Sequence, residues 1–577
     1  MKKTFYHIIC AASLLGGLTA CEDFFDVKPQ DVILFDDFWN EKTDVDAIVA
    51  GIYSGMQSEG MISRMMVWGE FRSDNINVGG NIDKNLDLEK IFKEDIKATN
   101  SYTTWSEFYN IINRCNTVIQ YAPGVAERDP SYTESELRAT IAEVSALRDL
   151  CYFYLIRTFR DVPYTTQAFI EDSQRMDLPA TPFNDVLDSL ITDLENIKGD
   201  AIKRYPETKP LYQTGRITQD AIHAMLCEMY LWKKDYVNSI HYADLVIQSK
   251  LDQEEEAKNN SNSMQMQEEN IFNGYPLIKG ELGFGTGYNR YGNAYNNIFG
   301  EGNSKESIFE LTFMKGEDNM LSNGAVNSLY SNGKVINGYA APSDFIGQDI
   351  SASSFRVYNN KYDARSYENI YSMGSGYAIA KYAWESVLID ITNNPFSTLF
   401  MNLYPENKNK SNWIIYRLTD IMLLKAEALA QTMTENTEDK AWNDSIRREA
   451  FTLVNAVNKR SMCQSPLKDT LVYKDYNTKT TIKDLVLLER QRELMFEGKR
   501  WYDLVRHSIC DGNTQTLRSK ALQKYSSNTS AIESKLTKMD AIFWPYNYDE
   551  LRVNKNLKQN PAFPSGEEGS YENSVIK

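Results

Sequence analysis

The sequence predicts a mainly α-helical protein, built as a stack of irregular helix hairpins beside a loop-rich part with a few short strands. Apolar residues recur at steps of three and four over about 35–250 and again over 411–510, which is typical of amphipathic helices. The segment at about 251–410 is instead rich in Gly, Asn and Tyr, and only short pieces such as ESIFELTF read as strands. A polar stretch that begins near residue 251 predicts an exposed loop between the two.

Two stretches show the helical pattern most clearly. Residues 181–197 (TPFNDVLDSLITDLENI) place apolar side chains on one face, and Thr181 and Pro182 supply an N-cap and a first-turn proline. Residues 133–164 (TESELRATIAEVSALRDLCYFYLIRTFRDVPY) predict a second long helix, which ends before Pro163. Trp105 lies on a further apolar helical face and is interpreted as a core residue.

One helix pair carries a repeat signature. Within residues 219–249, the small residues Cys227 and Ser239 and the aromatic Tyr230 stand at the spacing of a tetratricopeptide repeat. The small residues let two helices approach, and the ring fills the gap between them. The match is partial, because a position that is usually aromatic is Ala243.

The N-terminus predicts export and lipidation. Residues 1–20 combine a basic start, an apolar core and small residues before a cleavage point, which is the layout of a secretory signal. Leu18 to Cys21 resemble a bacterial lipobox, so Cys21 is predicted to be the lipid-anchored first residue of the mature chain. The alternative is an ordinary secreted protein with a chance cysteine at this place. No later stretch is long and apolar enough to span a membrane.

The charge and the titratable residues exclude several functions. A formal net charge of −17 makes nucleic acid and anionic membrane surfaces poor partners. The histidines outside the leader, His223, His241 and His507, form no metal motif, so neither a metal nor a cofactor is expected.

The cysteines do not predict a disulfide framework. Beyond the leader and Cys21, five remain, with wide spacing and no CxxC pair. Cys115, Cys151 and Cys227 fall in apolar helical patterns and are predicted to be buried free thiols. Whether Cys463 and Cys510 pair is left open by the sequence.

A dense run of charges occupies residues 487–507. Glu489, Glu493 and Glu497 recur every four residues among arginines, which predicts a ladder of ion pairs along one helix, broken at Gly498. Two carboxylates could also act as general acid and base on a glycosidic bond. The regular helical spacing favours the structural interpretation.

Four segments together resemble the SusD/RagB family of Bacteroidetes outer-membrane lipoproteins. They are residues 146–164, 414–431, 487–507 and 543–563, and the third is the most specific. With the opening CEDFFDVKPQ, these blocks extend over almost the whole mature chain, 21–577, which the resemblance implies to be a single domain. The resemblance also implies a fold of about four tetratricopeptide-like helix pairs that pack against an irregular, loop-rich half with a few short strands.

The resemblance implies a non-enzymatic role at the cell surface. Family members are expected to bind an oligosaccharide, or in some cases peptides, and to pass it to a SusC-like TonB-dependent outer-membrane transporter. Acidic residues directly after the lipidated cysteine, Glu22, Asp23 and Asp26, resemble an export signal to the leaflet that faces the medium. They could also simply keep the tether solvated.

Residues 280–300 (GELGFGTGYNRYGNAYNNIFG) are the first candidate ligand site. A sugar ring stacks its C–H face on an aromatic ring and needs hydrogen bonds for its hydroxyls. This stretch offers both kinds of group among glycines that free the backbone. The candidate residues are Phe284, Tyr288, Asn289, Arg290, Tyr291, Asn293 and Tyr295. The alternative is that the tyrosines pack the loop onto the body of the protein or onto the transporter.

Residues 68–81 (WGEFRSDNINVGGN) are the second candidate, because they resemble the family's early loop near the ligand groove. Arg72, Asp74 and Asn75 could hold hydroxyl groups, although Asp and Asn are also ordinary turn formers. The sequence thus predicts a glycan-binding lipoprotein, with a peptide-binding member of the family as the alternative and a surface glycoside hydrolase as a weaker one.

Overall fold

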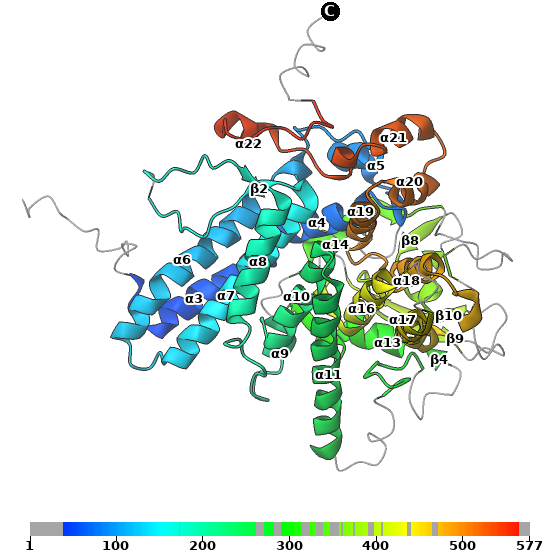
Figure 1. Ribbon diagram of the computed structural model, residues 1–577, viewed down its shortest axis with the longest axis horizontal. Coiled ribbons are helices and arrows are strands. Elements are labelled where there is room, and N and C mark those ends of the chain that lie inside the picture. Colours follow the sequence, from blue (N-terminus) through cyan, green and yellow to red (C-terminus); the bar gives the residue numbers. More distant parts are fainter. Residues whose placement is uncertain are drawn as a thin grey trace, which may run out of the picture.

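The structure is a computed structural model, and Figure 1 shows it as two helical groups with a strand-containing part beside the second. The described residues are 38–171, 173–260, 271–281, 290–313, 322–330, 338–344, 346, 357–358, 362–372, 376–390, 397–405, 408–434, 440–463 and 471–564. The predicted leader and the lipidation residue Cys21 lie outside them.

The first group contains four long helices that pack in succession. They are α3 (Lys42–Met56), α6 (Ser106–Arg128), α7 (Glu134–Phe159) and α8 (Phe183–Ile197). Thr133 and Glu136 form a capping box at the start of α7, and the helix ends at Phe159, ahead of Pro163 as predicted. At α8 the prediction was one residue off, because Pro182 itself occupies the N-cap position and Thr181 does not cap the helix.

The second group continues from α8 and supplies the repeat-like pairs. Its helices are α10 (Gln219–Lys233), α11 (Tyr236–Asn260), α16 (Leu418–Thr432), α17 (Lys440–Ser461), α18 (Lys479–Leu494) and α19 (Arg500–Asp511). With α6–α7, the consecutive pairs α10–α11, α16–α17 and α18–α19 match the mainly α, tetratricopeptide-like expectation.

The α10–α11 contact confirms the role of the small residues. The Ser239 hydroxyl donates to the Cys227 carbonyl across 2.9 Å, so the two helices touch at this point. Tyr230 stacks on Tyr242 with ring centroids 5.7 Å apart. The prediction of a loop from about residue 251 is wrong up to residue 260, because α11 ends only at Asn260. Glu, Gln, Lys and Ala are good helix formers even where no apolar face marks the helix.

Shorter elements join the two groups and close the C-terminal end. The first are α4 (Glu59–Met66), the π-helical turn η1 (Val67–Phe71), β1 (Ile76–Val78), η2 (Ile82–Lys84), α5 (Leu86–Phe92), η3 (Ser101–Thr103), β2 (Val162–Pro163), β3 (Ala180–Thr181) and α9 (Tyr212–Gly215). The later ones are η6 (Tyr473–Asp475), α20 (Gln515–Ala521), η7 (Leu522–Lys524), α21 (Thr529–Leu536), η8 (Met539–Ile542) and α22 (Tyr548–Val553).

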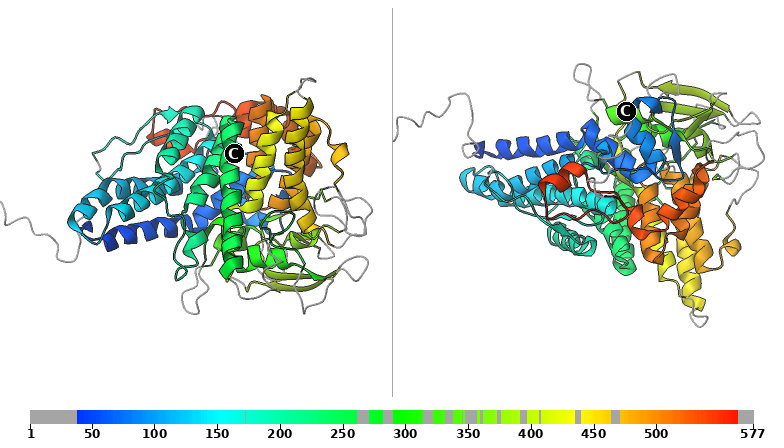
Figure 2. Two further views of the ribbon diagram at one scale, coloured as in Figure 1. Left: turned by 60° about the horizontal axis from the view of Figure 1, so that its bottom comes forward. Right: turned by 90° about the horizontal axis from the view of Figure 1, so that it is seen from above.

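The strands form small antiparallel sheets rather than one large one. In the second half they are β4 (Arg290–Tyr291), β5 (Ser307–Leu311), β6 (Ala340–Pro342), β7 (Ile370–Ser372), β8 (Tyr377–Ile379), β9 (Trp384–Asp390), β10 (Ser397–Leu403) and β11 (Trp413–Arg417). Their orders are β10-β9-β4, β11-β5, β1-β6 and β7-β8, while β2 pairs with β3. Between them lie α13 (Asn293–Tyr295), η4 (Asn296–Glu301), α14 (Gly324–Leu329) and α15 (Arg365–Glu368). Figure 2 shows this part to one side of the yellow and orange helices.

The core is shared by the helices and the strand-containing part. One apolar cluster extends from α3 through α7 and β5 to the C-terminal segment, and a second one lies between α11, α16, α17 and α18. Trp105 is buried, as predicted for a core residue. Cys115, Cys151 and Cys227 are buried free thiols, and Cys463 and Cys510 are also free. Among the described residues, none of the helices has the length and apolarity to cross a bilayer.

Candidate ligand site

The first candidate stretch begins at the edge of the three-stranded sheet. Arg290 lies on β4 opposite Asp390 of β9, and its side chain is exposed. Asn293 follows at the start of α13, where its amide donates to the Lys279 carbonyl across 2.9 Å. Phe284, Tyr288 and Asn289 lie outside the described residues. Among the described candidates of this stretch, Arg290 is therefore the one whose side chain is exposed to solvent.

Tyr291 and Tyr295 do not form an exposed platform. Both are buried, and the Tyr295 hydroxyl donates to the Ala380 and Trp384 carbonyls at 3.0 and 3.1 Å. A ring held in this way packs the loop onto the body, which was the alternative considered from the sequence. We correct the prediction for these two residues, because their rings lack a free face for a sugar.

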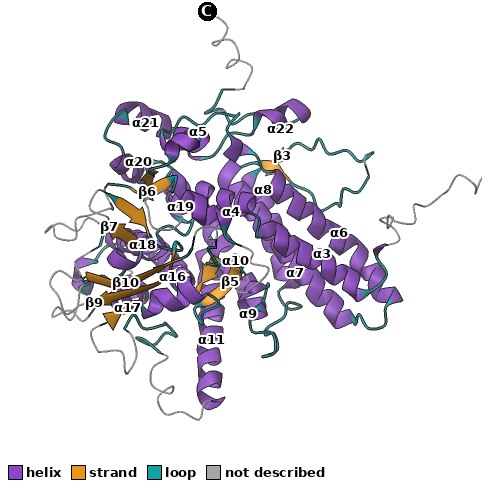
Figure 3. Ribbon diagram, turned by 180° about the vertical axis from the view of Figure 1, so that it is seen from behind, coloured by secondary structure: helices purple, strands orange, loops and turns teal. Residues whose placement is uncertain are grey.

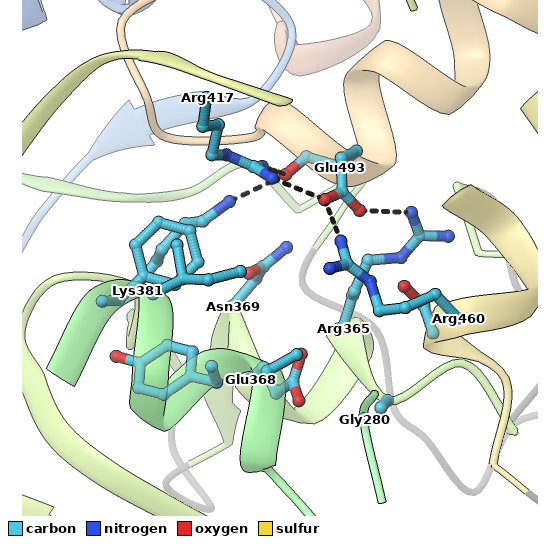
Figure 4. A pocket seen from close by; sticks show the side chains of 14 residues that line it. Gly280, Arg365, Glu368, Asn369, Lys381, Arg417, Arg460 and Glu493 are labelled. Atoms are coloured by element: carbon cyan, nitrogen blue, oxygen red, sulfur yellow. Dashed lines mark hydrogen bonds and ion pairs between the residues drawn. The ribbon is translucent and has the colours of Figure 1, made fainter. Parts of the chain in front are cut away.

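Beneath this stretch lies a small cavity, which Figure 4 shows from close by. The residues that line it include Gly280, Tyr295, Phe299, Glu368 and Arg460. Its volume of about 20 Å³ holds one water molecule but no sugar ring. The cavity is thus part of the interior and not the ligand site.

One wall of the cavity is a buried set of charges that we call the Glu493 network. It consists of Arg365, Lys381, Arg417, Arg460, Glu489, Glu493 and Glu497. The Glu493 carboxylate accepts hydrogen bonds from Arg417 at 2.7 Å, from Arg365 at 3.0 Å and from Arg460. Figure 4 shows these guanidiniums converging on it from three different elements.

The network corrects the predicted ladder along one helix. α18 ends at Leu494, so Glu497 lies in the connection to α19, and the carboxylates pair mainly with arginines of α15, β11 and α17. Burial alone would raise the pKa of Glu493, but Arg460, Arg417 and Arg365 outweigh burial and hold that pKa well below its usual range. A general acid needs the opposite shift, so this geometry supports the structural interpretation of the block.

Glu368 beside the cavity gives a pH prediction. Burial raises the pKa of Glu368 to about 7, although Arg460 opposes the shift. The folded protein therefore binds a proton that the unfolded chain releases between about pH 4.5 and 7, and stability is lost as the pH rises through this window. We expect the wild type to lose on the order of 3 kcal/mol relative to Glu368→Gln between pH 4.5 and 7.5.

Urea unfolding of both proteins at several pH values measures this difference. Glu385→Gln, at a more exposed carboxylate that bonds Asn402, serves as the control and should leave the pH dependence of stability unchanged. Parallel curves for the wild type and Glu368→Gln would contradict the assignment.

The second candidate loop is also internal, which corrects its predicted role. The Arg72 guanidinium pairs with Glu94 at 2.8 Å and bonds the Ala541 carbonyl at 2.7 Å. Asp74 accepts two hydrogen bonds from Arg500 at 2.8 and 2.9 Å, and the Asn75 amide donates to Glu70 at 2.7 Å. All three are completely buried. Their polar groups hold the early loop against the C-terminal segments, so no hydroxyl of a ligand reaches them.

A large open groove lies elsewhere, at one end of α6, and no sequence pattern predicted it. It is bordered by α6, by the connection between β2 and β3 and by α22, and its volume is about 570 Å³. Figure 3 shows α22 and this connection at the same end of α6. We call it the α6–α22 groove. Its residues are scattered over positions 105–116, 163–178 and 550–557, so no local pattern could have predicted it.

Comparisons with known proteins agree with the fold. The family model described as the SusD family matches residues 305–563, and the model described as starch-binding associating with outer membrane matches residues 23–231. SusD-like protein P38 of Formosa agariphila is 25% identical and covers 95% of this chain and 97% of its own length. SusD-like protein P2 of the same organism is 23% identical, over 88% of this chain and 91% of that protein.

Solved structures share the architecture. A SusD superfamily protein from Bacteroides vulgatus superposes with a TM-score of 0.62 at 18% identity, over 91% of this chain and 100% of that one. A laminarin binding SusD-like protein gives a TM-score of 0.55 at 19% identity, with the same coverage.

The fold defines a class of protein in which helix pairs of the tetratricopeptide type pack beside small antiparallel sheets. The chain is a member of the SusD/RagB family. That family consists of non-enzymatic carbohydrate-binding proteins, so the chain is a binding protein and not a glycoside hydrolase.

Proposed function

We propose that the protein is a cell-surface lipoprotein that captures oligosaccharides and delivers them to a SusC-like TonB-dependent transporter in the outer membrane. The observation that carries this proposal is that two family models match successive parts of the chain, 23–231 and 305–563. One of them describes starch binding in association with the outer membrane. The laminarin-binding neighbour, which shares the fold, adds support for a glycan ligand.

The lipid anchor and the orientation follow from the N-terminal sequence. Acylation of Cys21 would hold the chain on the outer membrane, and Glu22, Asp23 and Asp26 would direct it to the face exposed to the medium. The mature chain, 21–577, is proposed to act as one SusD-like domain.

For the ligand site we propose Arg290 and Asn293, together with the candidate residues Phe284, Tyr288 and Asn289 that precede them in the sequence. The exposed Arg290 guanidinium has five N–H donors for ring hydroxyls. It stands directly after the candidate aromatic residues in the sequence, so the two kinds of group that a sugar needs are close along the chain.

Isothermal titration of residues 22–577 against neutral and acidic oligosaccharides tests the function. We expect saturable binding of a glycan that is not degraded, and a loss of about tenfold in affinity for Arg290→Ala and for Tyr288→Ala. Arg175→Ala and Trp442→Ala, at an exposed arginine and an exposed aromatic residue outside this stretch, are the controls and should bind as the wild type does.

Other outcomes point elsewhere. Glycan binding that is unchanged in both Arg290→Ala and Tyr288→Ala would contradict the proposed site but not the proposed function. Binding of peptides in place of every glycan would replace the ligand class.

A further inference from the structure

The walls of the α6–α22 groove are held in place by hydrogen bonds across it. The Asn113 amide of α6 donates to the Phe169 carbonyl and accepts from the Phe169 N–H, at 2.8 and 2.7 Å. On the other side, the Asn554 amide donates to the Leu178 carbonyl across 2.7 Å. These two sets of hydrogen bonds thus fix the connection between β2 and β3 to α6 and to the end of α22. The groove is formed before any partner arrives.

Most of its polar side chains are already used inside the protein. The Tyr109 hydroxyl donates to the Pro163 carbonyl at 2.7 Å, and the Asn116 amide donates to the Gln167 carbonyl at 3.1 Å. The Asn113 and Asn554 amides make the hydrogen bonds that fix the groove walls. A sugar carries a hydroxyl on nearly every carbon and would leave many of them unpaired here, which is unfavourable. The groove therefore suits apolar side chains better than an oligosaccharide.

Large apolar side chains surround this opening on the surface. Met176 and Val553, which line it, are 58% and 74% exposed, and Ile170, next to the lining residue Phe169, is 36% exposed. Exposed aliphatic residues around an apolar depression mark sites of protein association, and methionine adapts to irregular partners.

The charges of the groove restrict the partner further. Asp177 and Glu550 line it, whereas the described lining residues include no lysine, arginine or histidine. Glu550 is half-buried, and burial raises the pKa of its carboxyl group. A basic residue of the partner next to Glu550 would keep this carboxylate charged and gain an ion pair, while an acidic one would be repelled.

The geometry points to the α6–α22 groove as a docking site for an apolar segment, flanked by a lysine or arginine, of the transporter with which this protein works. The identity of that partner rests on the proposed function, whereas the site and the chemistry of the segment come from the groove itself. Docking here would leave the surface around Arg290 available for a glycan.

Affinity for the purified transporter, measured by biolayer interferometry in detergent, tests the inference. Met176→Lys and Val553→Lys place a positive charge in the contact, and Asn110→Trp fills the groove from an exposed position of α6 without adding a charge. We expect each to weaken transporter binding at least about tenfold. Glu550→Lys should weaken it as well, through repulsion of the basic residue. The matched control is Val237→Lys, which places the same charge at a 73% exposed valine of α11 and should stay within about twofold of the wild type.

The same variants are titrated with the glycan, so that the two proposals fail separately. Transporter binding that is equal for all groove variants and the wild type would overturn the docking site and leave the proposed function intact. If the groove variants alone lost self-association, the groove would bind a second copy of the chain. If they alone failed to bind the glycan, the groove would bind a sugar. Either result would overturn the transporter docking site. A wild-type protein that binds the glycan but no transporter would contradict both the docking site and the proposed delivery to a transporter.

Discussion

Replacing Glu493 with alanine is expected to lower the free energy of unfolding by about 3–5 kcal/mol, because three buried guanidiniums lose the carboxylate that they share. Arg365, Arg417 and Arg460 all bond this one carboxylate, which is 3% exposed. Removing it takes away three charge-assisted hydrogen bonds and leaves the three guanidiniums in an interior that water does not reach. Circular dichroism during guanidinium chloride unfolding measures the loss.

The control for this variant is Glu134→Ala. Glu134 pairs with Arg138 one helical turn away, but its side chain is 84% exposed, and such surface pairs contribute at most about 0.5 kcal/mol. If the two substitutions reduced stability equally, the Glu493 network would not hold the strand-containing part to the helices. Glu493→Gln should lie between the wild type and alanine, since the amide keeps the volume but loses the charge.

The second large effect is expected for Gly69→Ala, which should destabilise the protein by about 3 kcal/mol. Gly69 lies in the π-helical turn η1, and a Cβ atom on it would stand 1.7 Å from the Gly498 carbonyl oxygen. That oxygen belongs to the backbone of the α18–α19 connection, so no side chain rotation can relieve the overlap. Either η1 or the connection must move, and both are buried.

Gly51→Ala is the matched control for Gly69→Ala. Gly51 also lies inside a helix, α3, but a Cβ atom there meets nothing within 4 Å. The same substitution should therefore stabilise the protein slightly, by up to about 1 kcal/mol, because alanine favours the helix. Thermal unfolding of both variants provides the comparison, and a neutral Gly69→Ala would show that η1 and the connection have room to separate.

The fold was predictable because its signals are local. Apolar spacing places α7 and α8 close to their observed ends, and the small residues Cys227 and Ser239 mark the contact between α10 and α11. The end of α11 was missed, since a solvated helix of Glu, Gln and Lys carries no apolar period.

The candidate site was predictable only in part, because exposure depends on residues far away in the chain. Nothing in the local pattern distinguishes Tyr295, whose hydroxyl bonds carbonyls near residue 380, from a tyrosine that faces solvent. The same holds for Arg72, which bonds the Ile542 carbonyl, 470 residues further on, in addition to Glu94. Arg290 stays a candidate since it stands at the edge of its sheet.

The bond between Asp74 and Arg500 also determines when the newly made protein can finish folding. The two residues are 426 positions apart, so Asp74 lacks this partner until nearly the entire chain is present. Until then the Asp74 carboxylate stays hydrated, because burying it unpaired is too unfavourable. We therefore expect a polypeptide truncated before Arg500 to be cleaved by proteases faster than the full chain.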